Sequence, residues 1–213
     1  MPLSETLKQI EENLLKKDEI RQEIHKAMRK ATRLSKRAIF LVHKHELDEA
    51  EKTLRQAEEL FTQLANLSEG FPDLLYMGSV DSAYQEYAEA HILVGLVRER
   101  RFVHFNEISV PAGSYVLGLA DVIGEFRRRA LDSLRKGEIE KAEGSLDLME
   151  TIYAELINLD DIHFLISGLR RKVDVGRRVV EATRGDITIE VRRNLLENSI
   201  KELERTLEAK RKG

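Results

Sequence analysis

The stretch IRQEIHKAMRKATRLSKRAIFLVHK, residues 20–44, decides the fold class, because its apolar residues return every three or four positions. That interval matches the turn of an α-helix, so these side chains form one apolar stripe along a helix that we expect to span residues 4–44. The following segment, residues 46–67, has the same spacing, and an antiparallel pair of helices is the natural packing. The stripe consists of Ile20, Ile24, Ala27, Met28, Ala31, Leu34, Ala38, Leu41 and Val42.

The rest of the chain also predicts helices, since it contains only three prolines and is rich in residues that lose little side-chain freedom in a helix. Asp81 or Ser82 is the expected N-cap of the third helix, Gly137 is the expected C-cap of the fourth, and the RGD sequence at 184–186 is expected to be a turn between two helices. We therefore predict a single all-α bundle of six or seven helices over residues 1–213. The expected later helices span residues 80–102, 115–137, 138–157, 163–183 and 188–210.

Composition narrows the possible functions. The chain has no cysteine, which excludes a disulfide framework, a thiolate metal site and a cysteine nucleophile. Its 35 basic and 38 acidic residues leave a net charge of −3, so any surface for an anionic partner must arise from local segregation of charge. Neither a signal-peptide core nor an apolar run long enough for a bilayer is visible, so we expect a soluble, cytoplasmic protein without a membrane partner.

Four acidic residues lie in otherwise apolar helical sequence. Glu86 and Glu89 are three positions apart, and Asp121 and Glu125 are four apart, so each pair shares a helix face. Like charges on one face repel unless a cation lies between them, and four carboxylates on two facing helices would form an all-oxygen site for Mg²⁺ or Mn²⁺. The alternative is that the acids simply lie on solvated faces, which is common. Gly118, Ala120 and Gly124 around Asp121 favour the site, because such small residues permit close approach of another helix.

Basic residues also cluster, and most such runs are solvated helix faces. The run at Arg127, Arg128 and Arg129 differs, because it begins within one turn of Glu125. Guanidinium groups beside a metal–carboxylate centre suit a phosphodiester substrate, whose phosphate they hold and whose developing charge they offset. The combination indicates phosphoryl chemistry.

Four motifs, in this order, resemble the translin and translin-associated factor X (Trax) family. They are SKRAIFLVHK at 35–44, YQEYAEA at 84–90, YVLGLADVIGEFRR at 115–128 and GLRRKVDVGRRVVEATR at 168–184. The resemblance covers about residues 18 to 186. The acidic YQEYAEA segment is more similar to the Trax branch than to translin, and the short segment between the third and fourth helices resembles a prokaryotic, archaeal member.

The resemblance implies a function. Trax-type subunits are the Mg²⁺-dependent endoribonuclease of the complex called C3PO, and family members assemble as hollow octamers that enclose RNA. Carried onto this chain, the acids of the motifs are Glu86, Glu89, Asp121 and Glu125, which we expect to bind Mg²⁺ (or Mn²⁺) and to be catalytic. We expect a homo-oligomer acting on single-stranded or short duplex RNA. The RNA-binding candidates are Arg127, Arg128, Arg129, Arg33, Lys36 and Arg37.

Two alternatives remain open. One is a non-catalytic scaffold of the translin type that binds RNA or single-stranded DNA, in which the acids make only structural ion pairs. The other is a redox di-metal bundle, suggested by Asp160 and His163 three positions apart, although such bundles need two motifs of this kind and the chain has one.

Overall fold

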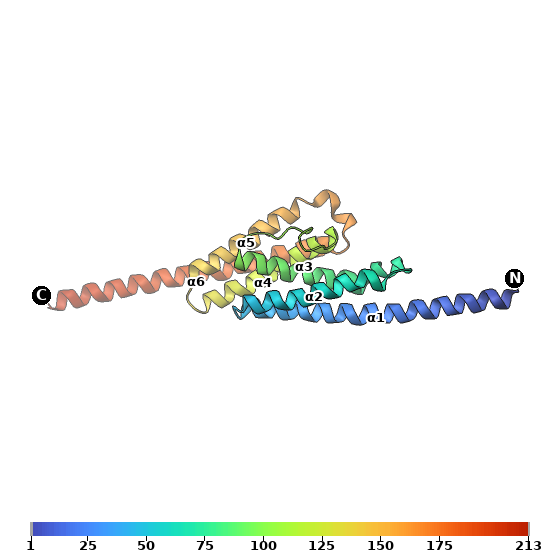
Figure 1. Cartoon of the computed structure of the whole chain (residues 1–213). Coiled ribbons are helices and arrows are strands. Elements are labelled where there is room, and N and C mark those ends of the chain that lie inside the picture. The colour runs from blue at the N-terminus through green and yellow to red at the C-terminus, as the bar shows by residue number, and fades with distance from the viewer. Residues whose placement is uncertain (1, 213) are drawn as a thin grey trace. The chain divides into compact units, whose positions relative to one another are not determined.

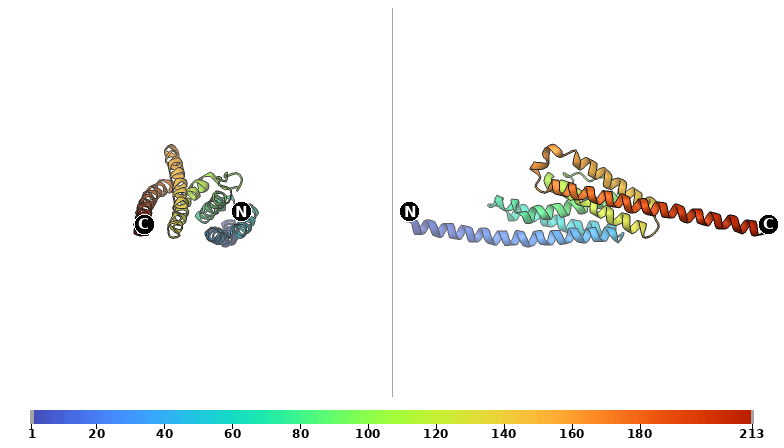
Figure 2. Two further views of the ribbon diagram at one scale, coloured as in Figure 1. Left: turned by 90° about the vertical axis from the view of Figure 1, so that its left-hand side faces the viewer. Right: turned by 180° about the vertical axis from the view of Figure 1, so that it is seen from behind.

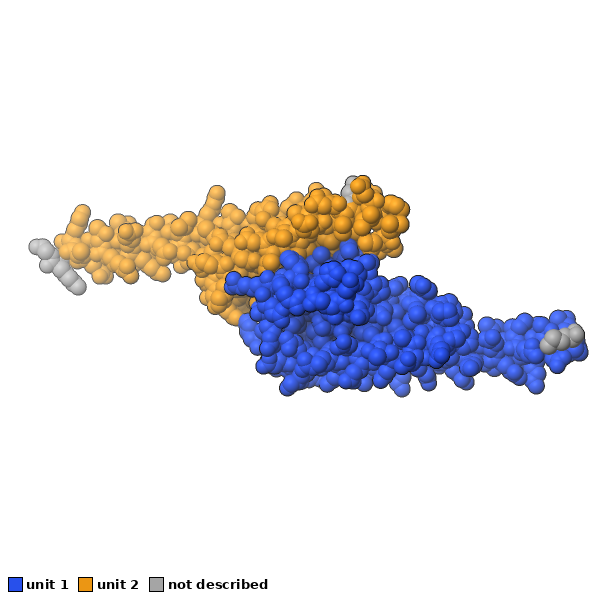
Figure 3. Space-filling model, turned by 45° about the horizontal axis from the view of Figure 1, so that its top comes forward, with its two compact units in different colours: residues 1–119 blue, residues 120–213 orange. Residues whose placement is uncertain are grey.

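The structure is a computed structural model and describes residues 2–212. Over this range it contains six α-helices, two short 3₁₀-helices and no β-strand, which confirms the all-α fold class. The chain divides into two compact units, residues 1–119 and 120–213 (Figure 3). The prediction of one domain over residues 1–213 stays a prediction, and its two end residues lie outside the described range.

The division falls inside the fourth helix, α4. The first unit contains α1 (Leu3–His43), α2 (Leu47–Leu67), the 3₁₀-helix η1 (Pro72–Tyr76), α3 (Gly78–Arg98) and the first turns of α4 (Ala112–Leu134). The second unit contains the remainder of α4, α5 (Ile139–Ile157), the 3₁₀-helix η2 (Asp160–Leu165) and α6 (Leu169–Lys212).

The core of the first unit forms around α1. Helices α1 and α2 run side by side as the predicted antiparallel pair, and α1 also packs along α3 (Figure 1). Ile24, Met28 and Val42 of the α1 stripe are completely buried. The second half of helix α3 is buried on nearly all sides, since Ala88, Ala90, Ile92 and Leu93 point in different directions around the helix and have no exposed surface. This part of α3 therefore lies between its neighbours and is the central element of the unit.

Helix α3 begins earlier than predicted. Its N-cap is Met77, and the prediction of Asp81 or Ser82 is wrong. Pro72 opens the preceding 3₁₀-helix, and Met77 then adopts extended backbone angles from which the helix starts at once. The hydroxyl of Ser82 instead donates a hydrogen bond to the carbonyl of Gly78, one turn back within the helix, at 2.7 Å.

Helix α6 is longer than predicted, and the expected turn at RGD 184–186 is wrong. The chain stays helical without interruption from Leu169 to Lys212 (Figure 2). One glycine lowers helix stability by about 1 kcal/mol but removes no backbone donor, unlike proline, so helical neighbours carry the helix through it. Arg184 also binds a side chain of α5, and Asp186 binds a side chain of α4. These two contacts hold residues 184–186 in the helix within the second unit.

A close backbone contact joins α4 to α3 within the first unit. A Cβ atom added at Gly118 would lie 2.7 Å from the carbonyl oxygen of Gln85 and 2.8 Å from the amide nitrogen of Glu89. Both distances are shorter than van der Waals contact. The atoms concerned belong to the backbone, so they cannot rotate away as the end of a side chain can. The prediction that a small residue here permits close helix approach is confirmed at Gly118, whereas nothing lies within 4 Å of a Cβ at Gly124.

Replacing Gly118 with alanine should therefore destabilise the protein although alanine is the better helix former. We expect the free energy of unfolding to fall by about 1–3 kcal/mol, the usual penalty of overpacking. Gly124→Ala on the same helix is the matched control and should be neutral or stabilising by up to about 1 kcal/mol. Urea denaturation followed by circular dichroism measures both, and equal effects of the two substitutions would contradict the contact.

A partly buried histidine packs against the same core. The ring of His91 packs edge-on against Tyr87, with centroids 4.4 Å apart. Its Nε2 atom is the one buried side-chain polar atom without a hydrogen-bond partner among the described residues. Burial disfavours the charged imidazolium and lowers the pKa of His91 from 6.5 to about 4. The folded protein therefore holds this ring neutral at pH values where the unfolded chain protonates it.

Stability should consequently depend on pH through His91. Between pH 6.5 and about 4 the unfolded state binds more protons, so the stabilisation is complete above this window and is lost as pH falls through it, by up to about 3 kcal/mol. We expect His91→Phe to remove this part of the pH dependence. Urea unfolding of both proteins at several pH values in the window measures the difference, and parallel stability curves would contradict it.

Candidate carboxylate site

Glu86 and Glu89 lie on the middle of α3. One carboxylate oxygen of Glu86 is 3.1 Å from the Nζ atom of Lys36 on α1, and the Glu86 side chain is 22% exposed. Glu89 is 7% exposed and, among the described residues, is the only buried acidic or basic residue. Burying a carboxylate is unfavourable unless hydrogen bonds or a cation compensate it. Buried acids are uncommon in proteins, which makes Glu89 a candidate functional position.

The contact at Gly118 fixes the backbone that carries these acids. It presses the first turns of α4 against the segment from Gln85 to Glu89, so the backbone of this segment has little room to move. A helix held in this way positions its carboxylates more tightly than a solvated helix does. The first pair of acids is therefore pre-positioned within the first unit.

Asp121 and Glu125 lie on the part of α4 that belongs to the second unit, and both are partly buried. The ammonium group of Lys172 on α6 donates a hydrogen bond to the carboxylate of Asp121. One turn further along α6, a Cβ at Gly176 would lie 3.1 Å from the Cδ1 atom of Ile123, so the two helices approach closely there. The second pair thus also lies beside a lysine.

The two pairs share an arrangement that the sequence did not predict: in each, one acid contacts a lysine from a neighbouring helix. Oxygen ligands without nitrogen or sulfur suit a hard cation such as Mg²⁺ or Mn²⁺, so the chemistry of the donors fits the predicted metal. Among the described residues, no group of three or more histidine, aspartate or glutamate side chains is gathered as a metal site. The four predicted ligands stay a prediction.

The predicted RNA-binding residues differ in how they are engaged. Arg127 donates to the hydroxyl of Thr183 at 2.8 Å and pairs with Asp186 at 3.2 Å, so it holds α4 to α6. Arg129 is partly buried, and burial lowers the pKa of its guanidinium group. Arg128 is exposed.

The predicted basic run on α1 is divided in the same way. Lys36 pairs with Glu86 although its own side chain is 62% exposed, and Arg33 and Arg37 are exposed and lie in no salt bridge among the described residues. All six assignments stay predictions. In the di-metal alternative, the side chain of Asp160 lies outside the described residues.

A cavity lined by positively charged side chains lies beside α1 and was not predicted from the sequence. Arg21, His25 and Lys26 contribute to it. A signal was present, because Arg21, His25, Arg29 and Arg33 recur every fourth residue and so share one helix face. Residues 77–79 form the opposite wall of the cavity. The sequence does not predict this wall, because it depends on the packing of α3 against α1.

No helix in the described part of the chain is both long enough and apolar enough to span a membrane. The Translin family profile matches residues 19–183, most of the chain and nearly the range of the motif resemblance. This chain belongs to the translin family. Similarity within the family extends to an uncharacterised protein of Methanocaldococcus jannaschii, MJ0175, which is 33% identical over 193 residues, 90% of this chain and 85% of that protein.

Several solved structures share the fold. AfC3PO has a TM-score of 0.80 and 30% identity, with 89% of this chain and 99% of that chain covered. AfC3PO in complex with duplex RNA has a TM-score of 0.79 and 30% identity, with 89% of this chain and 98% of that chain covered. Apo-NeC3PO has a TM-score of 0.75 and 25% identity, also with 89% of this chain and 98% of that chain covered.

Proposed function

We propose that this translin-family protein binds RNA and cleaves it as a metal-dependent endoribonuclease. The observation that carries the proposal is the buried Glu89, which shares a helix face with Glu86 and whose backbone lies close to Gly118, in a chain 30% identical to AfC3PO, whose complex with duplex RNA has been solved. The proposed site consists of Glu86, Glu89, Asp121 and Glu125. Single-stranded RNA, short duplex RNA and single-stranded DNA are the candidate ligands.

In the proposed mechanism the acids bind Mg²⁺ or Mn²⁺, which when bound polarises the scissile phosphate and lowers the pKa of a bound water for in-line attack. Glu86, Glu89 and Asp121 serve as ligands, and Glu125 serves as a ligand or orients the water. Lys36 and Lys172 neutralise their carboxylates in the absence of metal. Because each lysine side chain is flexible, it can withdraw when a divalent cation takes its place.

The same lysines favour a second candidate function, a non-catalytic RNA-binding scaffold of the translin type. If Lys36 and Lys172 neutralise the acids permanently, Glu86 and Asp121 act only as structural ion pairs. RNA would then bind with a strong salt dependence but remain intact in Mg²⁺. The two functions differ in whether the acids are needed for cleavage.

The proposed function also includes assembly of several copies, as an octamer on the family resemblance. Two exposed apolar stripes support it, one at the start of α1 and one at the end of α6. In both, the residues are spaced by four, three and four positions, the pattern with which helices pack in coiled coils. The stripes consist of Leu3, Leu7, Ile10 and Leu14, and of Leu196, Ile200, Leu203 and Leu207.

Removing charge from the acids should abolish cleavage without abolishing binding. Glu89→Gln and Asp121→Asn keep the shape of each side chain but lose metal affinity, so we expect cleavage of labelled RNA in Mg²⁺ to fall by at least about 100-fold in each. Glu58→Gln, at an exposed acid of α2, is the matched control and should cleave normally. Undiminished cleavage by both site variants would contradict the site, and intact RNA with the wild-type protein would favour the scaffold.

Charged residues in the α1 stripe should reduce the size of the assembly. Leu7→Lys with Leu14→Lys places two ammonium groups where apolar burial of about 1.5–3 kcal/mol per leucine is expected. Glu5→Lys with Glu12→Lys is the control, because these positions lie on the opposite side of the helix from the stripe. Light scattering after gel filtration measures the mass, and an unchanged mass of the leucine variant would contradict an interface at this stripe.

A further inference from the structure

A cavity of about 690 Å³ lies in the first unit between α1 and the start of α3. Four arginine and lysine side chains line it from α1, namely Arg21, Lys26, Arg29 and Arg33, together with His25. Residues 77–79 form the opposite wall. We call this feature the basic groove. It contains no acidic side chain among its lining residues.

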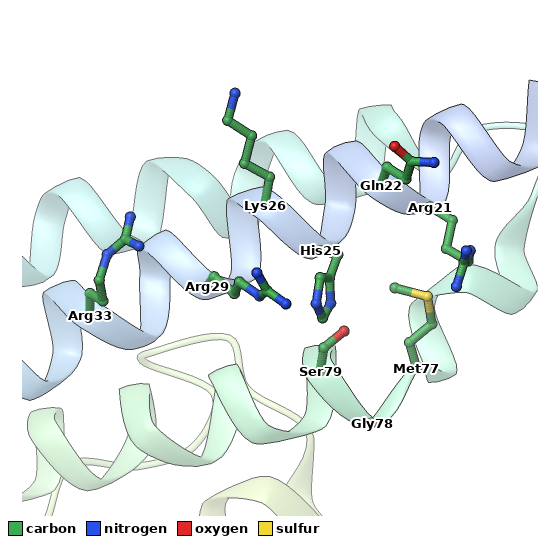
Figure 4. A pocket seen from close by; sticks show the side chains of 9 residues that line it. All are labelled: Arg21, Gln22, His25, Lys26, Arg29, Arg33, Met77, Gly78 and Ser79. Carbon is green, nitrogen blue, oxygen red and sulfur yellow. The ribbon is translucent and has the colours of Figure 1, made fainter.

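The core packing of α1 determines the direction of these side chains. Ile24 and Met28 are completely buried, so the residues that immediately follow them along the helix, His25 and Arg29, lie at the edge of the buried face. Figure 4 shows both side chains extending toward Ser79, whose hydroxyl group is directed at the His25 ring, while Lys26 extends away from this wall. The packing of α1 therefore sets the side of the helix on which His25 and Arg29 lie, and Lys26 lies at the outer side of the groove.

The cations of the groove differ in whether an acid pairs with them. Arg21, at one end of the groove, pairs with Asp18. Lys26, Arg29 and Arg33 lie in no salt bridge within the described part of the chain. Three of the four arginine and lysine residues in the groove thus carry charge that no salt bridge compensates.

Uncompensated positive charge of this kind opposes folding. Cations four residues apart on a helix, as Arg29 and Arg33 are, destabilise it by about 0.2–0.5 kcal/mol per pair. A bound anion removes this repulsion. The opposite wall also favours an anion. The N–H groups of Gly78 and Ser79, the first two of α3, precede the hydrogen bonds that Val80 and Asp81 donate to the carbonyl of Met77, and they carry partial positive charge.

The length of the groove indicates which anion it accepts. From Arg21 to Arg33 the helix advances twelve residues at about 1.5 Å each, about 18 Å. A single phosphate occupies only a small part of this distance, whereas phosphates along a nucleic-acid strand follow each other at about 3.4 Å of helix axis. A row of cations matches a row of phosphates.

We propose that the basic groove binds the sugar–phosphate backbone of an RNA strand, through Lys26, Arg29 and Arg33 on α1 and the amide groups at the start of α3. This inference rests on the proposed RNA-binding function and deepens it. The contacts are to phosphates, so the groove strengthens binding equally for all sequences and does not select among them. It lies on different residues from the carboxylates and can be tested without cleavage.

The test compares two triple variants in binding to fluorescein-labelled RNA, in EDTA so that the RNA stays intact. The groove variant is Lys26→Ala, Arg29→Ala and Arg33→Ala. The control is Lys30→Ala, Lys52→Ala and Arg55→Ala, which removes the same charge from exposed positions on α1 and α2. Circular dichroism and solution mass establish that both variants fold and assemble as the wild-type protein does.

We expect the groove variant to bind at least about tenfold more weakly at low salt. Each lost phosphate contact lowers the slope of log affinity against log salt by about 0.7–0.9, so its slope should fall by about 2–3 while the control slope stays near the wild-type value. Equal losses in both variants, or no loss in the groove variant, would overturn the groove assignment alone. Wild-type protein that binds no RNA would overturn the proposed function and this inference together.

A competition experiment separates a strand from a single phosphate. Unlabelled RNA should displace the labelled strand from wild-type protein far better than inorganic phosphate at the same phosphate concentration. Equal displacement by the two would overturn the assignment to a strand backbone and identify the groove as a site for single phosphate groups.

Discussion

Burial of the α1 stripe is the interaction on which the arrangement of the first unit depends. Ile24, Met28 and Val42 have no exposed surface, and their contacts with α2 and α3 fix the rotation of α1 about its own axis. That rotation directs Lys36 toward Glu86 and places His25 and Arg29 beside the start of α3. One apolar interface therefore sets the position of both the acids' lysine partner and the basic groove.

Most of the fold follows from local sequence, and the exceptions have physical causes. The predicted spans of the first helix and of residues 138–157 agree closely with α1 and α5, because their apolar spacing is regular and their ends carry turn residues. The chain terminates α4 as predicted before Gly137, whose φ of 74° is the left-handed conformation that glycine adopts readily. Gly185 produces no such turn, because its neighbours favour the helix and side chains of the second unit hold it.

The candidate site is predictable to a smaller extent. Helical spacing places Glu86 with Glu89 and Asp121 with Glu125, and no more than that. It does not predict that Glu89 is buried while Glu86 is partly exposed. Nor does it predict the contacts of Lys36 with Glu86 and of Lys172 with Asp121, because each contact joins two residues about 50 positions apart in the chain. The basic groove has the same limit: spacing shows the row of cations on α1, but only tertiary packing supplies the wall that makes it a cavity.

The lysine contacts compensate the charge of Glu86 and of Asp121 within the protein. Placing a carboxylate in a partly buried position is unfavourable unless a cation or hydrogen bonds compensate it. The lysine stem is also long and flexible enough to let its charge move aside. Under the proposed function, a divalent cation would bring two charges to oxygen atoms that a single ammonium group holds with one, so the lysine would be the partner to move. The ammonium group of Lys36 would then add to the positive charge along α1, the charge that the proposed RNA backbone requires.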